Sequence, residues 1–130
     1  MLERIFRRFK KVLIIEDDNA LRAIIAERVA GAGFRVLEAA NGSDGFLAAV
    51  EEHPHLILLD LMMPKTDGIN FLSELRSEGE WGSSVPVIIL TNLMQDEKLR
   101  EYVLKYSVAK YIEKVNLKLD DLLGDIAKLI

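Results

Sequence analysis

The chain has 130 residues, half of them hydrophobic and 29% charged, with no cysteine and a formal net charge of −4. This length suits one domain of roughly 100–150 residues, and the absence of cysteine excludes disulfides, thiolate–zinc sites and thiol nucleophiles. No apolar run approaches the ~18 residues of a membrane span, and the mild acidic balance disfavours a nucleic-acid-binding surface over the whole domain, so we expect a small soluble intracellular domain.

The first eleven residues, MLERIFRRFKK, form a basic segment that differs from the rest of the chain. Five of them are Lys or Arg, and Leu2, Ile5, Phe6 and Phe9 fall at helical spacing. No apolar stretch of roughly 7–15 residues follows, so the pattern is not that of a secretory signal. We expect residues 1–10 to be a basic amphipathic extension that packs its apolar stripe on a domain spanning residues 11–130. Contact with a membrane surface or a partner helix is the alternative.

The first half of the domain alternates between strand-like apolar runs and helical patterns. In chain order we predict a strand at 12–15, a helix with apolar residues from 21 to 29, a strand at 34–39 and a helix at 44–52. The first helix should stop at 31–33, where glycine accepts the positive φ that closes a helix. In these two helices the residues predicted to face the core are Leu21, Ile24, Ile25, Val29, Phe46, Leu47 and Val50.

The second half continues the same alternation. We predict a strand at 56–59, a helix from 67 to 79, a Gly/Ser-rich loop containing Trp81, a strand at 85–90, a helix at 95–105, a strand at 109–113 and a helix over 119–130. Gly124 lies inside the last helix and should cost up to about 1 kcal/mol relative to Ala. Five apolar strands joined by helices predict an α/β fold, a parallel sheet with helices on both faces.

Polar side chains collect where the predicted strands end. Glu16 and Asp17 follow the first strand, Asp60 the third and Thr91 the fourth, while the fifth strand stops just before Lys114. Ligands of such sheets bind at the carboxyl ends of the strands, so we expect three carboxylates, one hydroxyl and one ammonium to converge there. Each residue alone would be read as a turn, cap or surface residue. Their coincidence at strand ends favours a functional site.

This set of groups points to metal-assisted phosphoryl chemistry. Clustered carboxylates repel one another and need compensating positive charge. An all-oxygen set without His or Cys suits a hard cation such as Mg²⁺, and an ammonium and a hydroxyl can meet phosphoryl oxygens. A carboxylate held beside the metal can accept the phosphoryl group and form an aspartyl phosphate.

Four motifs resemble those of the receiver domains of bacterial two-component response regulators. They are VLIIEDD at the first strand, LILLDLMMPKTDG around Asp60, VIILTN at the fourth strand and KYIEK at the fifth. The resemblance covers residues 11–130 and implies a flavodoxin-like (βα)5 fold with strand order 2-1-3-4-5. It implies a cytoplasmic signalling switch of the single-domain chemotaxis type, which catalyses only its own phosphorylation and slow dephosphorylation.

The resemblance also implies a role for each residue at the metal. Asp60 is the phosphorylated aspartate and a metal ligand. Asp17 binds Mg²⁺ directly, Glu16 acts mainly through a coordinated water, and the carbonyl of Met62 is a further protein ligand.

The same resemblance implies the roles of the remaining site residues and the partners. Thr91 and Lys114 hold the phosphoryl oxygens, and Tyr111 is the aromatic residue whose rotamer follows Thr91 when the domain switches. The phosphoryl donor is a phosphohistidine of a sensor histidine kinase or a histidine phosphotransfer protein. Phosphorylation changes the affinity of the face formed by helix 4, strand 5 and helix 5 for a downstream protein. The domain is a monomer or a phosphorylation-dependent dimer, and we expect no direct nucleic-acid binding.

Three positions depart from the family pattern. Asn92 replaces the usual small residue after the threonine, and Val115 replaces the usual proline after the lysine, so we expect a trans peptide bond there. Lys110 stands where an acidic residue is common and should make the neighbouring face more basic. Met62 and Leu93 flank the acceptor and the threonine and should crowd an attacking water, which predicts an aspartyl phosphate that lasts for hours.

Two other functions remain open. Asn92 and Val115 are compatible with a constitutive interaction module that has kept the fold and lost the switch. An aspartyl-phosphate phosphatase of the haloacid-dehalogenase type would need an acid two residues after the nucleophile, where this chain has Met62. His53 and His55 are interpreted as loop residues because no carboxylate or cysteine accompanies them in a metal-binding pattern.

Overall fold

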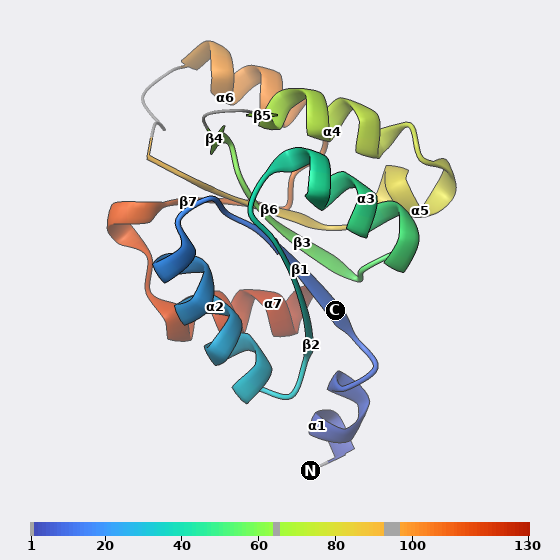
Figure 1. Ribbon diagram of the computed structural model, residues 1–130, viewed down its shortest axis with the longest axis vertical. Helices are drawn as coiled ribbons and strands as arrows, with labels where there is room; N and C mark the ends of the chain where they lie inside the picture. Colours follow the sequence, from blue (N-terminus) through green and yellow to red (C-terminus); the bar gives the residue numbers. More distant parts are fainter. Residues whose placement is uncertain (1, 64–65, 93–96) are drawn as a thin grey trace.

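The computed structural model, which describes residues 2–63, 66–92 and 97–130, is a parallel sheet between two layers of helices (Figure 1). The five strands lie in the order β2-β1-β3-β6-β7, which is the predicted order 2-1-3-4-5. The predicted fold class is therefore confirmed. The strands are β1 (Lys11–Ile15), β2 (Arg35–Ala39), β3 (Leu56–Asp60), β6 (Val87–Thr91) and β7 (Lys110–Glu113).

Seven α-helices are described around this sheet. They are α1 (Leu2–Arg7), α2 (Asn19–Gly31), α3 (Gly42–Glu52), α4 (Gly68–Arg76), α5 (Gly79–Ser84), α6 (Glu97–Leu104) and α7 (Leu119–Leu129). Two short strands that the sequence did not indicate, β4 (Met62–Met63) and β5 (Thr66–Asp67), pair antiparallel beyond β3. None of the described helices is long and apolar enough to cross a membrane.

The central strands are apolar throughout because both of their faces are covered. Leu13 and Ile15 belong to the core beneath α3 and α4, whereas Val12 and Ile14 belong to the core beneath α2 and α7. Successive side chains of a strand point to opposite faces of the sheet. A strand buried on both faces therefore loses the polar alternation of a half-exposed strand.

Two predicted core residues are wrong. Ile24 is 50% exposed and Leu47 is 59% exposed, so both lie on the outer sides of their helices. Ala26 and Ala49 occupy buried positions instead. Hydrophobicity alone did not identify the buried stripe, because small residues let these helices approach the sheet closely.

The segment around Trp81 is the helix α5 rather than the predicted loop. The indole N–H of Trp81 donates to the carbonyl of Pro54 at 2.9 Å, and its ring stacks on His53 with centroids 4.3 Å apart. A Cβ at Gly82 would lie 2.2 Å from the carbonyl oxygen of Leu75. The glycine that made this segment look like a loop is therefore needed for α5 to pack against α4.

The expectation that the N-terminal extension packs its apolar stripe on its own domain is also wrong. The extension contains the short helix α1, but Leu2, Ile5, Phe6 and Phe9 are between 45% and 70% exposed. The helix is held instead by Arg7, whose guanidinium donates to the carbonyl of Ala32 at 3.3 Å.

The connection after β7 agrees with the expectation for Val115. All described peptide bonds are trans, and residues Lys114–Asn116 form a 3-10 turn before α7. The predicted beginning of the preceding helix, at 95, lies outside the described residues, and α6 is described from Glu97.

Candidate functional site

The polar residues at the strand ends come together at one edge of the sheet. Glu16 and Asp17 follow β1, Asp60 ends β3, and Thr91 ends β6. One oxygen from each of the three carboxylates lies within 4.8 Å of the others. The paired register aligns Asp60 with Leu90, so the buried Thr91 lies one residue beyond the level of Asp60 on the adjacent strand.

Lys114 places its ammonium between two of these carboxylates. Its Nζ lies 2.6 Å from Oε1 of Glu16 and 3.1 Å from Oδ2 of Asp60. The side chains of Glu16 and Asp60 are buried, and that of Lys114 is only 15% exposed. The lysine therefore links the ends of β1, β3 and β7, while Asp17 beside them is exposed.

The pKa values follow from this burial and crowding. Burial and the proximity of Asp60 raise the pKa of Glu16 from 4.5 to about 7, although Lys114 opposes the shift. Burial also acts to raise the pKa of Asp17, but hydrogen bonding with Glu16 and Asp60 brings it below its usual value. Burial acts to lower the pKa of Lys114, and the two carboxylates reverse this and raise it. Glu16 therefore exchanges a proton near neutral pH, where an ordinary glutamate is ionised.

The donor set fits a hard divalent cation. Three carboxylates and one ammonium leave an excess of two negative charges when all four groups are ionised. Oε2 of Glu16 accepts from the backbone N–H of Asp18 at 3.2 Å, while the buried Oε1 makes an ion pair with Lys114 but no well-directed hydrogen bond. Oxygen-rich sites with partly unsatisfied acceptors suit Mg²⁺. The side chain of Met62 lies outside what the structure describes, and the ligand role of its carbonyl stays a prediction.

Arg22 is a positioning residue that the sequence analysis missed. Its Nη1 donates to the backbone carbonyl of Glu16 at 2.7 Å, and its Nε donates to Oε1 of Glu38 at 3.3 Å. Asp18 caps α2 by accepting from the N–H of Leu21. The sequence feature that could have indicated this role is the position of Arg22, a basic residue near the start of α2, the helix that follows the acidic residues 16–18.

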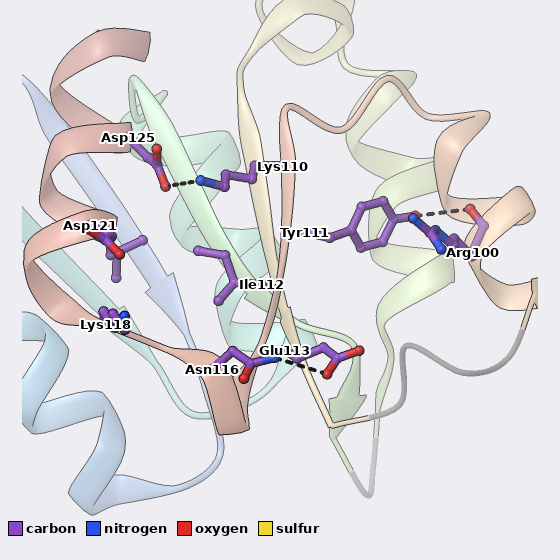
Figure 2. A pocket seen from close by; sticks show the side chains of 10 residues that line it. Arg100, Lys110, Tyr111, Ile112, Glu113, Asn116, Lys118, Asp121 and Asp125 are labelled. Atoms are coloured by element: carbon purple, nitrogen blue, oxygen red, sulfur yellow. Dashed lines mark hydrogen bonds and ion pairs between the residues drawn. The ribbon is translucent and has the colours of Figure 1, made fainter.

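Tyr111 lies on β7, away from the carboxylates. Figure 2 shows its ring pointing toward α6, where its hydroxyl donates to the backbone carbonyl of Arg100 at 3.0 Å. Burial raises the pKa of this phenol. On the other side of β7, Lys110 and Asp125 form an ion pair at 2.6 Å across a cavity of about 380 Å³. Asp125 therefore offsets the positive charge that Lys110 was expected to add to this face.

The two histidines have structural partners. His53 takes the left-handed conformation at the end of α3, with φ 45°, and stacks on Trp81. Nδ1 of His55 accepts from the backbone N–H of Lys11 at 3.0 Å. Both lie in the connection between α3 and β3, as the sequence predicted.

Comparison with known proteins places these observations in one family. Residues 12–127 match the family model described as the response regulator receiver domain. The chain is 43% identical over 84 residues to the probable transcriptional regulator ycf27 of Porphyridium aerugineum, covering 65% of this chain and 33% of that protein. It is 45% identical over 80 residues to the KDP operon transcriptional regulatory protein KdpE of Escherichia coli, covering 62% of this chain and 34% of that protein. The chain thus spans about a third of the length of these relatives.

Solved structures share the same architecture. The receiver domain of the Francisella response regulator 1452 superposes with a TM-score of 0.80 at 29% identity, over 92% of this chain and 95% of that one. The chemotaxis protein CheY4 of Vibrio cholerae superposes with a TM-score of 0.83 at 22% identity, over 93% and 98% of the two chains.

Proposed function

This chain belongs to the response regulator receiver domain family, and we propose that Asp60 is the phosphoryl acceptor of a phosphorylation-dependent signalling switch. The observation that supports the proposal best is the ammonium of Lys114, which lies 3.1 Å from Asp60 and 2.6 Å from Glu16. A positive charge beside Asp60 supports the proposal because a phosphoryl group on that carboxylate would carry negative charge on its oxygens. The proposed donor is a phosphohistidine of a sensor histidine kinase or a phosphotransfer protein.

In the proposed reaction, an Asp60 carboxylate oxygen attacks the phosphorus of the donor. A P–O bond forms, the P–N bond to the imidazole breaks, and the imidazole leaves with the electron pair of that bond. Lys114 and the hydroxyl of Thr91 hold the oxygens of the transferred group. The chain catalyses only this phosphorylation of itself and the slow hydrolysis of the aspartyl phosphate, in which water takes the phosphoryl group and releases inorganic phosphate.

The carboxylates of Glu16, Asp17 and Asp60 would hold Mg²⁺, with the Met62 carbonyl as a further ligand. Bound there, the ion neutralises charge on the phosphoryl oxygens. The excess of negative charge over Lys114 supports this requirement for a divalent cation. Arg22 orients the loop by fixing the carbonyl of Glu16.

The proposed output face consists of α6, β7 and α7, which correspond to helix 4, strand 5 and helix 5 of the sequence analysis. When Thr91 moves toward a phosphoryl group, Tyr111 can turn inward only by releasing the carbonyl of Arg100. The ring would then leave the side of α6, and the surface offered to a downstream protein would change. We propose that this change sets the affinity for that protein, or for a second phosphorylated copy.

We further propose that the domain works in the cytoplasm and does not itself contact nucleic acid. Its relatives are named as transcriptional regulators, and one relative, from Synechocystis, is named as a DNA-binding regulator. The region that matches this chain is only about a third of each of these proteins. Excluding the basic residues 1–11, the remaining 119 residues carry a net charge of −8, because the first eleven carry +4 of the total of −4. Such a surface disfavours contact with phosphate backbones.

Labelling with acetyl phosphate tests the acceptor assignment. The wild-type chain should gain one phosphoryl group in the presence of Mg²⁺, seen as a mass increase, and Asp60→Asn should gain none. Asp121→Asn, which removes an exposed carboxylate of α7, is the matched control and should label normally. Persistent labelling of Asp60→Asn at its usual extent would contradict the assignment.

Decay of the label tests the predicted long lifetime. The basis of that prediction, crowding by Met62 and Leu93, lies outside the described side chains, so it rests on the sequence alone. We expect a half-life of hours, and a half-life below about one minute would refute the crowding argument. A constitutive interaction module, the competing function, would show neither labelling nor carboxylate-dependent Mg²⁺ binding in a titration.

A further inference from the structure

The extension before β1 leaves a group of large apolar side chains uncovered. Leu2 is 70% exposed, Phe6 63%, Phe9 60% and Ile5 45%. Side chains of this size are normally buried, and a contiguous exposed group of them marks an interaction surface. We call Leu2, Ile5, Phe6 and Phe9, together with the neighbouring exposed Arg8 and the adjoining Lys10, the N-terminal face.

The position of this face on the domain is fixed by Arg7. Its guanidinium lies 5.3 Å from the centroid of the Phe34 ring and donates to the carbonyl of Ala32. Beside it is a hollow of about 430 Å³ whose lining includes Phe6, Lys10 and Lys128. The apolar side chains are therefore presented next to basic groups by a segment that is attached to the domain.

The charge of the segment is opposite to that of the rest of the chain. Residues 1–11 contain five basic side chains and one acidic one, a net charge of +4, whereas residues 12–130 carry −8. This asymmetry creates a local positive potential on an acidic protein. The occupant of the N-terminal face should therefore be negatively charged and able to receive apolar side chains.

We propose that the N-terminal face binds the surface of an anionic lipid bilayer. Apolar side chains such as Phe6 and Phe9 enter the boundary between headgroups and acyl chains, while arginine and lysine stay among the anionic headgroups. The same face of a second copy would bring two segments of like charge together. Duplex nucleic acid would satisfy the positive charge but would leave the apolar side chains in water.

The arrangement of the fold makes this attachment compatible with signalling. The segment leads directly into the first residue of β1, while Glu16 follows the last residue of that strand. A strand of five residues spans roughly 16 Å, so α1 and Glu16 lie near opposite ends of β1; Figure 1 shows α1 at the end of the sheet where β1 begins. A chain lying on a bilayer through residues 2–10 would hold the other end of β1, and with it the carboxylate site, away from the lipid surface.

Vesicle flotation with the full chain tests the proposal. The chain should float with vesicles of phosphatidylcholine containing about one-third phosphatidylserine and should not float with phosphatidylcholine alone. Bound protein should fall as salt rises, since surface electrostatics are screened. The double variants F6S/F9S and R8E/K10E should each lower the partition coefficient about tenfold or more.

The matched control is the double variant I24S/L47S, which removes two apolar side chains of α2 and α3 that are 50% and 59% exposed. It should float like the wild type. Unchanged thermal unfolding and acetyl phosphate labelling verify that each variant is folded, and they keep this test independent of the proposed switch. If a face variant unfolds, the single variants F9S and K10E replace it.

Several outcomes would overturn the proposal. Equal flotation with neutral vesicles would remove the role of charge, and unchanged flotation of both face variants would remove the face. No flotation, combined with concentration-dependent dimerisation that F6S/F9S abolishes, would make the face an interface between copies. No flotation, combined with salt-dependent retardation of a DNA duplex that R8E/K10E abolishes, would make it a nucleic-acid contact.

Discussion

Replacing Glu16 by Gln should stabilise the protein when no divalent cation is present. Glu16 is fully buried, and burial together with Asp60 raises its pKa from 4.5 to about 7. A carboxyl whose pKa is higher in the folded chain than in the unfolded chain destabilises the folded state when it ionises. Gln keeps an oxygen that can accept from the N–H of Asp18 and removes the charge.

The size of the effect follows from the two pKa values. Each pKa unit corresponds to about 1.36 kcal/mol, so ionised Glu16 lowers the free energy of unfolding by about 3 kcal/mol at pH values above 7. The stability contributed by protonated Glu16 is fully present below pH 4.5 and is lost as the pH rises through about 7. Relative to the wild type, E16Q should therefore gain stability progressively over that window.

Urea unfolding in a chelating buffer, at a series of pH values between about 5 and 8, measures the effect. We expect the difference in unfolding free energy between E16Q and wild type to grow by about 2–3 kcal/mol across the series. Glu38→Gln, which removes a half-exposed carboxylate paired with Arg22, is the control. Millimolar Mg²⁺ should stabilise the wild type more than E16Q. A variant that is less stable than wild type at pH 8 without cation, or a difference that does not change with pH, would refute the reasoning.

Three further predictions concern stability away from the carboxylates. Gly124→Ala should raise the unfolding free energy by about 0.5–1 kcal/mol, because a Cβ there meets nothing within 4 Å. Gly45→Ala should instead lower it by about 1–3 kcal/mol, because its Cβ would lie 2.5 Å from the Ile15 side chain. Equal effects of the two substitutions in urea unfolding would contradict this pair of expectations. Burial, aided by nearby lysines, lowers the pKa of His55, whose Nδ1 accepts a backbone N–H at the start of β1. The free energy of unfolding should therefore fall as the pH drops below about 6.5. His55→Asn should lose this pH dependence, and an unchanged dependence of stability on pH in the variant would exclude His55 as its source. Arg76→Met should lower the free energy of unfolding by about 2–4 kcal/mol, because the half-buried guanidinium donates to four backbone carbonyls. Arg76→Lys should recover only part of this loss. Full recovery by Lys would show that the forked geometry of the guanidinium is unimportant.

The location of the site could be predicted because parallel strands end at one edge. Glu16, Asp60, Thr91 and Lys114 each follow or end a strand whose apolar run is plain in the sequence. The order of the strands came from the resemblance to a family. The distance from Lys114 to each carboxylate could not be predicted, because it depends on side-chain rotamers in a buried space.

The errors have a common physical origin, since sequence patterns do not reveal which surfaces meet. Trp81 lies in a helix because Gly82 allows α5 to contact Leu75, a tertiary reason that glycine content alone conceals. Ile24 is exposed although it shares a helical pattern with buried neighbours. For the N-terminal segment, periodicity correctly predicted a helix, but the expectation that the domain would cover its apolar side chains was wrong.

The dispersal of the site along the chain has a consequence for biosynthesis. Glu16 and Asp17 follow the first strand of the sheet in the chain, and Asp60 ends the third, whereas Lys114 follows the fifth. A nascent chain therefore carries all three carboxyl groups of the site before Lys114 leaves the ribosome. Until β7 joins the edge of the sheet, Glu16 and Asp60 have no lysine between them. Under the proposed function, a chain truncated before β7 would lack Lys114 and should not accept a phosphoryl group at Asp60.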